Sequence, residues 1–336
     1  LGIGETDKIA QVVRACAAGA HIVEADAGFC YLENVDRVLT TPGYTAYVKI
    51  ADGCNNRCAF CAIPYIRGNY VSRTMENIER EVRALAEKGV REIVLVAQDT
   101  TYYGKDLYHK PMLAELLRRV AAVEGVHWVR ALYCYPELID DELIDEIASE
   151  DKIVKYLDIP IQHINDTILR RMNRRYTAEH YKSLIADARE KMPDITLSSD
   201  IIVGFPGETD EDFEQTLRLV QDTRFDLLFT FLYSPRTGTP AASYEDNASP
   251  QDKQRRFERL LKTQDDIVAE KQAAYQGKTL RLLVDGAAKG PDYPYTARTE
   301  GNLLVCVRGE NIQIGEFIQA EIEKTSLRCL FAVKKS

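Results

Sequence analysis

A chain of 336 residues, of which 45% are hydrophobic and 28% charged, is long enough for two or three domains with packed cores. Its formal net charge of -9 argues against a broad phosphate-binding surface, because proteins that bind nucleic acid usually present a basic face. No apolar run is long enough to cross a bilayer and no secretory signal opens the sequence, so we expect a cytoplasmic protein without membrane contact.

Residues 1–42 precede the regular part of the chain. They open with Leu1 instead of Met, continue as a loop that enters a helix, and end at the turn residues Thr40, Thr41, Pro42 and Gly43. We interpret them as the remnant of a preceding domain and its linker, which makes the chain a fragment of a longer protein.

Residues 43–276 alternate between short apolar strands and amphipathic helices. Strands are predicted at 44–50, 92–97, 128–132, 156–159, 197–203 and 227–231, and helices are predicted to begin after Thr74, Thr177 and near Thr209. A further helix is expected over 138–147. Repeated strand–helix units favour a parallel sheet with right-handed crossovers, and six units are too few for an eight-fold barrel. We therefore predict an α/β fold, a partial (β/α)6 TIM-like barrel, whose chemistry collects at the C-terminal ends of the strands.

Residues 277–336 differ in pattern from the rest of the chain. A long charged helix is predicted over 251–276, and short strands follow at 279–284, 303–307 and 317–322 with turn residues between them. This pattern predicts a small antiparallel β-barrel as a separate domain.

Three of the eight cysteines lie within eight positions, directly after the first predicted strand. Cys54, Cys58 and Cys61 are spaced C-x3-C-x2-C. A [4Fe–4S] cubane normally takes four thiolates, so three would leave one iron open to a further ligand. A structural zinc ion needs a closed set of four ligands, and no fourth Cys or His lies nearby in sequence. The spacing therefore predicts one [4Fe–4S] cluster, with zinc as the weaker alternative.

The cysteine motif resembles the signature of the radical S-adenosylmethionine (SAM) superfamily, C-x3-C-x-aromatic-C, with Phe60 at the aromatic position. The resemblance implies that SAM binds the open iron through its amino and carboxylate groups. It also implies that an electron from the reduced cluster cleaves SAM to a 5′-deoxyadenosyl radical, chemistry that belongs to the cofactor.

Longer segments resemble the methylthiotransferases within that superfamily, namely YVKIADGCNNRCAFCAIPYIRG, LVAQDTTYYGKDLY, YLDIPIQH and DIIVGFPGETDEDF. The C-terminal barrel lies where that family has its TRAM domain. The segments AQDTTYYG and LYCYP look like the branch that modifies small-subunit ribosomal protein twelve. The resemblance therefore implies methylthiolation of the β-carbon of an aspartate in that protein.

Two other functions remain open. The first alternative is a tRNA-adenosine methylthiotransferase, and the second is a non-enzymatic iron–sulfur or zinc module on the ribosome. The resemblance also implies a reductant such as flavodoxin or ferredoxin, and contact with nucleic acid through the ribosome or a tRNA substrate. The family holds a second cluster in an N-terminal domain. Only Cys16 and Cys30 precede the motif here, so we expect that cluster in the full-length protein alone.

Further cofactor-binding candidates follow the predicted strands. Gln98 and Asp99 end the second strand, and Gln162 ends the fourth beside His163. Each could instead be a polar turn or a structural hydrogen-bonding residue.

Three more candidates follow later in the chain. Arg174 could pair with the SAM carboxylate through its planar fork or lie at a solvated helix end. Gly204 and Glu208 belong to the turn after the fifth strand, near which the family contacts adenine. The sequence singles out no catalytic residue, but four tyrosines could wall a radical pocket or pack in the core: Tyr102, Tyr103, Tyr133 and Tyr135.

Overall fold

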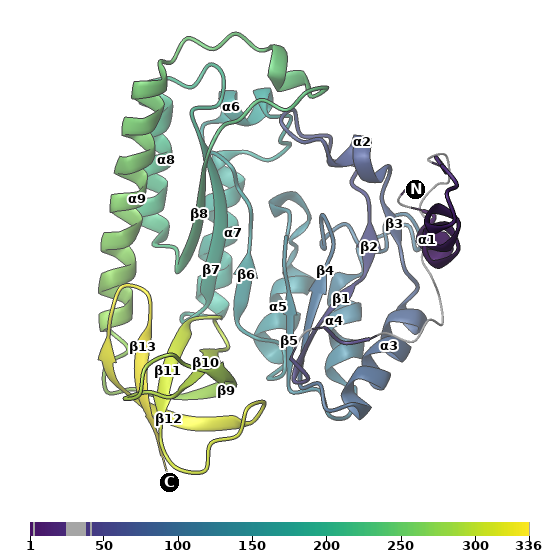
Figure 1. Cartoon of the computed structure of the whole chain (residues 1–336). Helices are drawn as coiled ribbons and strands as arrows, with labels where there is room; N and C mark the ends of the chain where they lie inside the picture. Colours follow the sequence, from purple (N-terminus) through teal and green to yellow (C-terminus); the bar gives the residue numbers. More distant parts are fainter. Residues whose placement is uncertain (3, 25–37, 41, 336) are drawn as a thin grey trace.

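The computed structural model describes residues 1–2, 4–24, 38–40 and 42–335 (Figure 1). Cys30 lies outside these residues. At the N-terminus a 3-10 turn (Thr6–Lys8) leads into helix α1 (Ile9–Ala17), which buries none of its side chains. None of the helices in the described ranges is long and apolar enough to span a membrane.

Six parallel strands form the body of the molecule. One sheet has the order β1-β4-β5 and a second the order β6-β7-β8. A single parallel bridge, between Val129 and Ile153, joins the two sheets side by side. The strands are β1 (Thr45–Lys49), β4 (Glu92–Val96), β5 (Trp128–Ala131), β6 (Tyr156–Asp158), β7 (Thr196–Val203) and β8 (Leu227–Leu232). The partial six-strand barrel is therefore confirmed, and among the described residues β1 and β8 remain its unpaired edges.

Helices cover one face of this sheet, which we call the outer face (Figure 1). Buried residues of alternating strand positions, such as Ala46, Val48 and Leu95, pack there against the helices. The opposite strand positions form the inner face. The larger helices are α3 (Met75–Glu87), α4 (Leu113–Ala121), α5 (Asp141–Ser149), α7 (Ala178–Lys191), α8 (Asp210–Thr223) and α9 (Pro250–Ala273).

The predicted helix starts are confirmed at three threonines. Thr74 and Thr177 accept hydrogen bonds from backbone N–H groups of the first turn, and Thr209 forms a reciprocal capping box with Asp212. The prediction for 138–147 was wrong at its start. Asp140 caps α5, so the helix begins at Asp141, and the residues before it form a separate 3-10 turn (Pro136–Leu138).

Shorter elements lie near the C-terminal ends of the strands and in the last connection. They are β2 (Ala51–Asp52), α2 (Ile63–Arg67), β3 (Val71–Ser72), α6 (Asp166–Arg171) and the 3-10 turn η3 (Pro240–Ser243). Strands β2 and β3 pair antiparallel and flank the cysteine loop. None of these short elements was predicted, because each is too brief to show a periodic pattern.

The C-terminal barrel is closed in the order β10-β11-β13-β12-β9. Its strands are β9 (Thr279–Ala287), β10 (Tyr295–Thr299), β11 (Leu304–Arg308), β12 (Phe317–Thr325) and β13 (Leu330–Lys334). The small barrel was predicted, but β10 and β13 were not. Four of its pairings are antiparallel, while β11 and β13 pair in parallel.

The barrel packs against the N-terminal ends of the parallel strands (Figure 1). Trp128 meets Phe317 edge to face, with ring centroids 4.8 Å apart. Glu92 accepts hydrogen bonds from Arg130 at 3.2 Å and from Arg298 of the barrel at 3.1 Å. A buried carboxylate thus joins the two domains.

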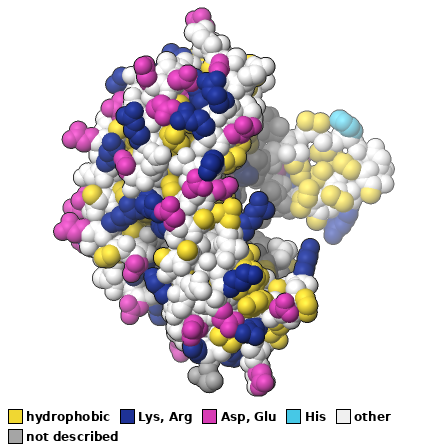
Figure 2. Space-filling model, turned by 90° about the vertical axis from the view of Figure 1, so that its left-hand side faces the viewer, with side chains coloured by type: hydrophobic (Ala, Val, Ile, Leu, Met, Phe, Trp, Pro, Cys, Tyr) yellow, Lys and Arg dark blue, Asp and Glu magenta, His cyan; other side chains and the backbone are white. Residues whose placement is uncertain are grey.

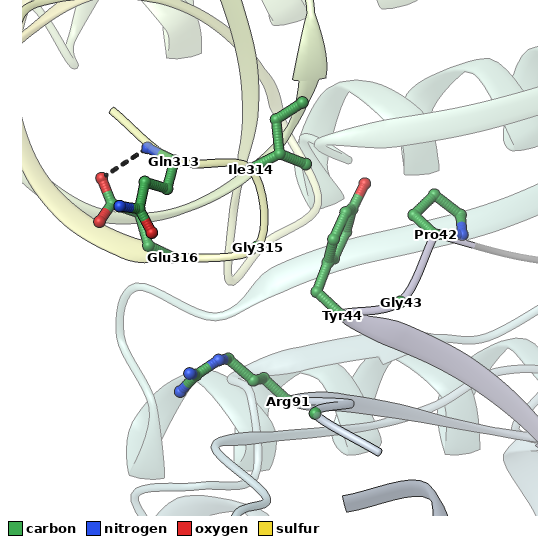
Figure 3. A pocket seen from close by; sticks show the side chains of 9 residues that line it. Pro42, Gly43, Tyr44, Arg91, Gln313, Ile314, Gly315 and Glu316 are labelled. Atoms are coloured by element: carbon green, nitrogen blue, oxygen red, sulfur yellow. Dashed lines mark hydrogen bonds between the residues drawn. The ribbon is translucent and has the colours of Figure 1, made fainter. Parts of the chain in front are cut away.

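A cavity of about 380 Å³ opens at the same junction (Figure 3). Tyr44, Pro42 and Arg91 line it from the parallel-strand domain, while Gln313 and Glu316 line it from the barrel. Tyr44 directly precedes β1, whereas the cysteines follow β2 at the other end. This cavity is therefore remote from the predicted cluster.

The surface formed by α8 and α9 carries basic and acidic side chains intermingled (Figure 2). Arg259 of α9 and Glu214 of α8, for example, form an ion pair with an Nη2–Oε2 distance of 3.2 Å. No strongly basic area is visible on this face, which agrees with the negative net charge.

We predict that Glu92→Gln lowers the free energy of unfolding by about 3–5 kcal/mol, because it leaves the buried Arg130 guanidinium without its counter-charge. Chemical denaturation followed by circular dichroism measures this loss. The matched control is Glu323→Gln, which breaks a more exposed pair with Arg308 and should cost under about 1 kcal/mol. Equal losses in the two variants would contradict the prediction.

Candidate metal centre

The cysteine loop follows β2 and is fixed by its backbone. Gly53 has φ +77, and a Cβ there would lie 2.1 Å from the Asn69 carbonyl oxygen, so only glycine fits. The Cys54 N–H donates to the Gly68 carbonyl at 3.2 Å, and the Ala59 N–H donates to the Met172 carbonyl at 2.9 Å. These contacts hold the loop between the two halves of the sheet.

All three thiols of the motif are free, and they are buried to different degrees. Cys58 is buried, while Cys54 and Cys61 are partly exposed. Burial raises the pKa of Cys54 to about 12 and also raises the pKa of Cys61. Because metal ligands must be deprotonated, cluster binding has to release these protons.

The donor set of the loop suits an iron–sulfur cluster. A cubane binds each thiolate to a different iron and takes soft thiolate ligands. In the described parts of the chain, no three or more His, Cys, Asp or Glu side chains gather tightly enough to hold one metal ion. Three unpaired thiols on one fixed loop are a suitable donor set for a cubane.

Arg174 lies against the cysteine loop in the buried interior. Its Nη1 donates to the Cys58 Sγ at 3.6 Å, and its Nη2 donates to the Pro160 carbonyl. The guanidinium also stacks over Tyr135 at 4.2 Å and contacts Tyr176. The alternative that Arg174 lies at a solvated helix end is therefore wrong, because its guanidinium is buried and contacts Cys58, a ligand of the predicted cluster.

Asp99 lies beside the loop from the other side, at the end of β4. Its carboxylate accepts hydrogen bonds from Asn56 of the cysteine loop at 2.8 Å and from the Thr101 hydroxyl at 2.6 Å. Burial raises the pKa of Asp99, and these hydrogen bonds oppose the rise. Asp99 therefore positions the loop. Its neighbour Gln98 keeps a buried Oε1 that has no hydrogen-bond partner among the described residues.

Gln162 and His163 follow β6 but differ in their surroundings. Gln162 has φ +66 and exchanges backbone hydrogen bonds with β7 at 2.8 and 2.9 Å. His163 is fully buried, and its ring contacts Glu208 at 3.4 Å and Thr216 at 3.3 Å. The histidine is thus a structural hydrogen-bonding residue.

Gly204 and Glu208 form one turn after β7. The Glu208 carboxylate accepts from the Gly204 N–H and pairs with Arg256 of α9 at 3.3 Å. Phe205, in the same turn, meets Phe60 of the cysteine loop edge to face, with centroids 6.5 Å apart. The structure therefore brings this turn and the cysteine loop together, with Glu208 holding the turn.

Sequence reasoning missed a group of residues on the inner face. Tyr133 was considered only as pocket wall or core, yet it has φ +60, which is unusual for a bulky residue and costs about 1–3 kcal/mol. Its N–H donates to the Asp158 carboxylate at 2.9 Å. Asp200 lies nearby on β7. Its pKa is raised to about 6, mainly because the carboxyl is buried and in part because Asp158 repels its charge. Strand alternation alone could have placed Asp158 and Asp200 on the face opposite the helices.

We predict that Cys58→Ala removes most of the iron that the reconstituted chain binds, about four atoms per chain for one cubane. The remaining two thiolates cannot complete a site for it. Iron analysis and visible absorbance measure the loss. Cys306→Ala changes a cysteine in β11 of the barrel and should leave the iron content unaltered. Full iron content in the Cys58→Ala protein would contradict the assignment.

We predict that Asp200→Asn stabilises the chain by about 3 kcal/mol at pH 7. Folding raises the pKa of the Asp200 carboxyl from 3.8 to about 6, so the free energy of unfolding falls as the pH rises through that interval. A neutral amide does not ionise, so the variant does not lose this stability. At pH 4 the folded-state carboxyl is protonated and the unfolded one roughly half protonated, so most of the gain should be lost. Thermal denaturation at pH 4 and pH 7 checks this, with the exposed Asp222→Asn as control. A variant less stable than the parent at pH 7 would refute it.

Two segments of the chain match known families. Residues 48–220 match the Radical SAM superfamily and residues 273–335 match the TRAM domain. The first segment contains the cysteine loop, and the second coincides with the closed barrel.

Three relatives bear the name ribosomal protein uS12 methylthiotransferase RimO. The protein from Clostridium botulinum (strain Hall) is 42% identical over 327 residues, which cover 96% of this chain and 73% of the relative. The protein from Desulfitobacterium hafniense (strain Y51) is 42% identical over 310 residues, covering 90% and 69%. The protein from Geotalea uraniireducens (strain Rf4) is 39% identical over 333 residues, covering 97% and 74%.

Solved structures are similar at the level of the fold. Coproporphyrinogen III oxidase (HemN) from Escherichia coli, a radical SAM enzyme, has a TM-score of 0.51 at 18% identity and covers 84% of this chain and 68% of its own. The methyltransferase TsrM from Kitasatospora setae has a TM-score of 0.50 at 20% identity, covering 59% and 38%. Together with the cysteine loop at the ends of six parallel strands, these matches show that the chain belongs to the radical SAM superfamily and, within it, to the family of the ribosomal protein uS12 methylthiotransferases.

Proposed function

We propose that this chain is a radical SAM methylthiotransferase that adds a methylthio group to the β-carbon of an aspartate in ribosomal protein uS12. The observation that carries the proposal is the combination of a three-thiol loop at the strand ends with 42% identity to a uS12 methylthiotransferase over 96% of the chain. Three thiolates leave one iron open, as SAM binding requires.

The residues around the loop have distinct roles in this proposal. Cys54, Cys58 and Cys61 hold the cluster, and Arg174 lies behind Cys58 as a fixed positive charge. The Oε1 of Gln98, which has no hydrogen-bond partner among the described residues, would accept a hydrogen bond from the SAM amino group. A bound cluster with SAM would supply radical chemistry there, and the surrounding protein would orient the cofactor and exclude water.

The turn after the fifth parallel strand completes the SAM site in this proposal. Gly204 has φ +74, and a Cβ there would lie 2.7 Å from the Lys253 side chain of α9, so the turn requires glycine, while Glu208 keeps the turn in shape. Phe60 and Gln162 line the same end of the sheet. Asp99 acts by holding the loop through Asn56.

Charge favours the protein substrate over tRNA. The C-terminal barrel, residues 277–336, has nine Lys and Arg against seven Asp and Glu, while the whole chain carries -9. A weakly basic barrel on an acidic body suits a basic ribosomal protein better than bare RNA. We further propose that the enzyme acts in the cytoplasm, where ribosomes are, and receives electrons from a flavodoxin or a ferredoxin.

Isotope transfer tests the proposal directly. The reconstituted chain is incubated with SAM, a reductant and either uS12 whose aspartate β-carbons carry deuterium or unlabelled tRNA. We expect uS12 to stimulate formation of 5′-deoxyadenosine and deuterium to appear in it, because the radical removes a β-hydrogen. The Cys58→Ala protein should form none. Stimulation by tRNA, without deuterium transfer from uS12, would establish the tRNA enzyme instead.

A further inference from the structure

Exposed aromatic side chains lie on the inner face of the parallel sheet, among them Tyr47, Tyr133 and Phe229. Tyr47 is 46% exposed, Tyr133 46% and Phe229 53%, whereas Ala46 and Val48, which alternate with Tyr47 on β1, are completely buried. Large aromatic side chains contribute most when they are buried. Several large aromatic side chains that are about half exposed on one face of the sheet therefore indicate a binding surface.

Asp200 lies among these aromatic residues. It is the register partner of Phe229 on the neighbouring strand, so the two side chains project side by side from the same face. Burial raises the pKa of Tyr133, and the nearby Asp158, Asp200 and Tyr47 raise it further, which places their polar groups within electrostatic range of its hydroxyl. We call Tyr47, Tyr133, Asp200 and Phe229 the inner-face cluster.

The Asp200 carboxylate makes no hydrogen bond or ion pair with any other described residue. Arg174 is the basic residue whose charge acts on it, but that guanidinium is already engaged by Cys58, Pro160 and Tyr176. A half-buried carboxylate without a partner is unfavourable in the free protein. Its charge becomes favourable once a cation arrives.

Tyr133 is held in place at the cost of backbone strain. Its carbonyl accepts from the Thr100 N–H at 3.0 Å, and its own N–H is bound by Asp158 at 2.9 Å. Both contacts fix the main chain, yet the ring remains half exposed on the inner face. A strained backbone conformation that keeps an aromatic side chain exposed is typical of a ligand-binding position.

We infer that the inner-face cluster binds the side chain of a lysine or arginine of the protein substrate, with Asp200 as counter-ion and the aromatic rings as walls. Aromatic faces attract cations, and a neighbouring carboxylate adds direct charge pairing. Proteins that belong to the ribosome are rich in basic side chains, and the chain itself carries -9. The bound cation holds the neighbouring target residue near the cysteine loop.

This inference rests on the proposed function, and a double-mutant cycle separates the two. A peptide that spans the modified aspartate of uS12 and its nearest basic residues is labelled with a fluorophore. A second peptide replaces the basic residues by uncharged norleucine. Each peptide is titrated with four cluster-loaded, SAM-bound proteins. These are the parent, Asp200→Asn, Phe229→Leu and the surface control Asp222→Asn. Fluorescence anisotropy gives the dissociation constant of each pair.

The parent and Asp222→Asn should bind the basic peptide equally. Asp200→Asn should bind it about tenfold more weakly, and Phe229→Leu by a smaller factor. All four proteins should bind the norleucine peptide with the same weak affinity, because that peptide has no cation to pair with Asp200. Asp200→Asn must remain folded, and its thermal denaturation at pH 7 verifies this.

Four outcomes would overturn the inference, and the last of them would overturn the proposed function too. Equal binding of the basic peptide by the parent and Asp200→Asn excludes the charge pair. A loss in Asp200→Asn that persists with the norleucine peptide shows that the carboxylate does not recognise a cation. Loss of SAM affinity in Asp200→Asn, measured in parallel by equilibrium dialysis, assigns the carboxylate to the cofactor. Absence of any peptide binding by the parent protein refutes the proposed function as well.

Discussion

The cysteine loop is held simultaneously by both halves of the parallel sheet, and the rest of the site depends on this. On one side Asp99, at the end of β4, binds the loop through Asn56. On the other side the Met172 carbonyl accepts from the Ala59 N–H, and Arg174 contacts Cys58. Between the two three-stranded sheets the described residues show one isolated backbone bridge, Val129 with Ile153, and a hydrogen bond from the Cys134 N–H to the Asp158 carbonyl at 2.8 Å. The loop therefore contributes to fixing the angle between the sheets as well as holding the three thiols.

Much of the fold could be predicted from the sequence because its signals are local. Apolar runs separated by capped helices indicate six strand–helix units, and the cysteine spacing indicates a cluster without any knowledge of the fold. Strands β10 and β13 escaped prediction, because Tyr295–Thr299 and Leu330–Lys334 are short and follow loops without clear periodicity. Closure of a barrel also depends on long-range pairing, such as the parallel pair β11–β13, which no local pattern encodes.

The site was predicted less completely than the fold. Asp99 and Arg174 lie against the cysteine loop, but the partners of the polar residues at the strand ends were not foreseeable. His163 and Glu208 contact each other across 45 positions, and Arg256 reaches Glu208 from α9. The inner-face carboxylates were missed because each lies in a strand whose buried residues dominate the pattern. The repulsion between the Asp158 and Asp200 carboxylates arises only because the fold places them on adjacent strands. Such a destabilising arrangement is typical of a functional site, where stability is lost in favour of function.

The junction between the two domains has a geometric consequence. Tyr44, Trp128, Val154, Tyr156 and Leu283 form one hydrophobic cluster that continues from the parallel strands into the barrel, and Glu92 reinforces it with Arg298. These aromatic contacts and the ion pair hold the barrel against the N-terminal ends of the strands, beside the cavity that Tyr44 and Gln313 line. The barrel and the cysteine loop lie at opposite ends of strands about 16 Å long. A partner that contacted the barrel would therefore have to extend along the whole length of these strands to bring a residue to the cysteine loop.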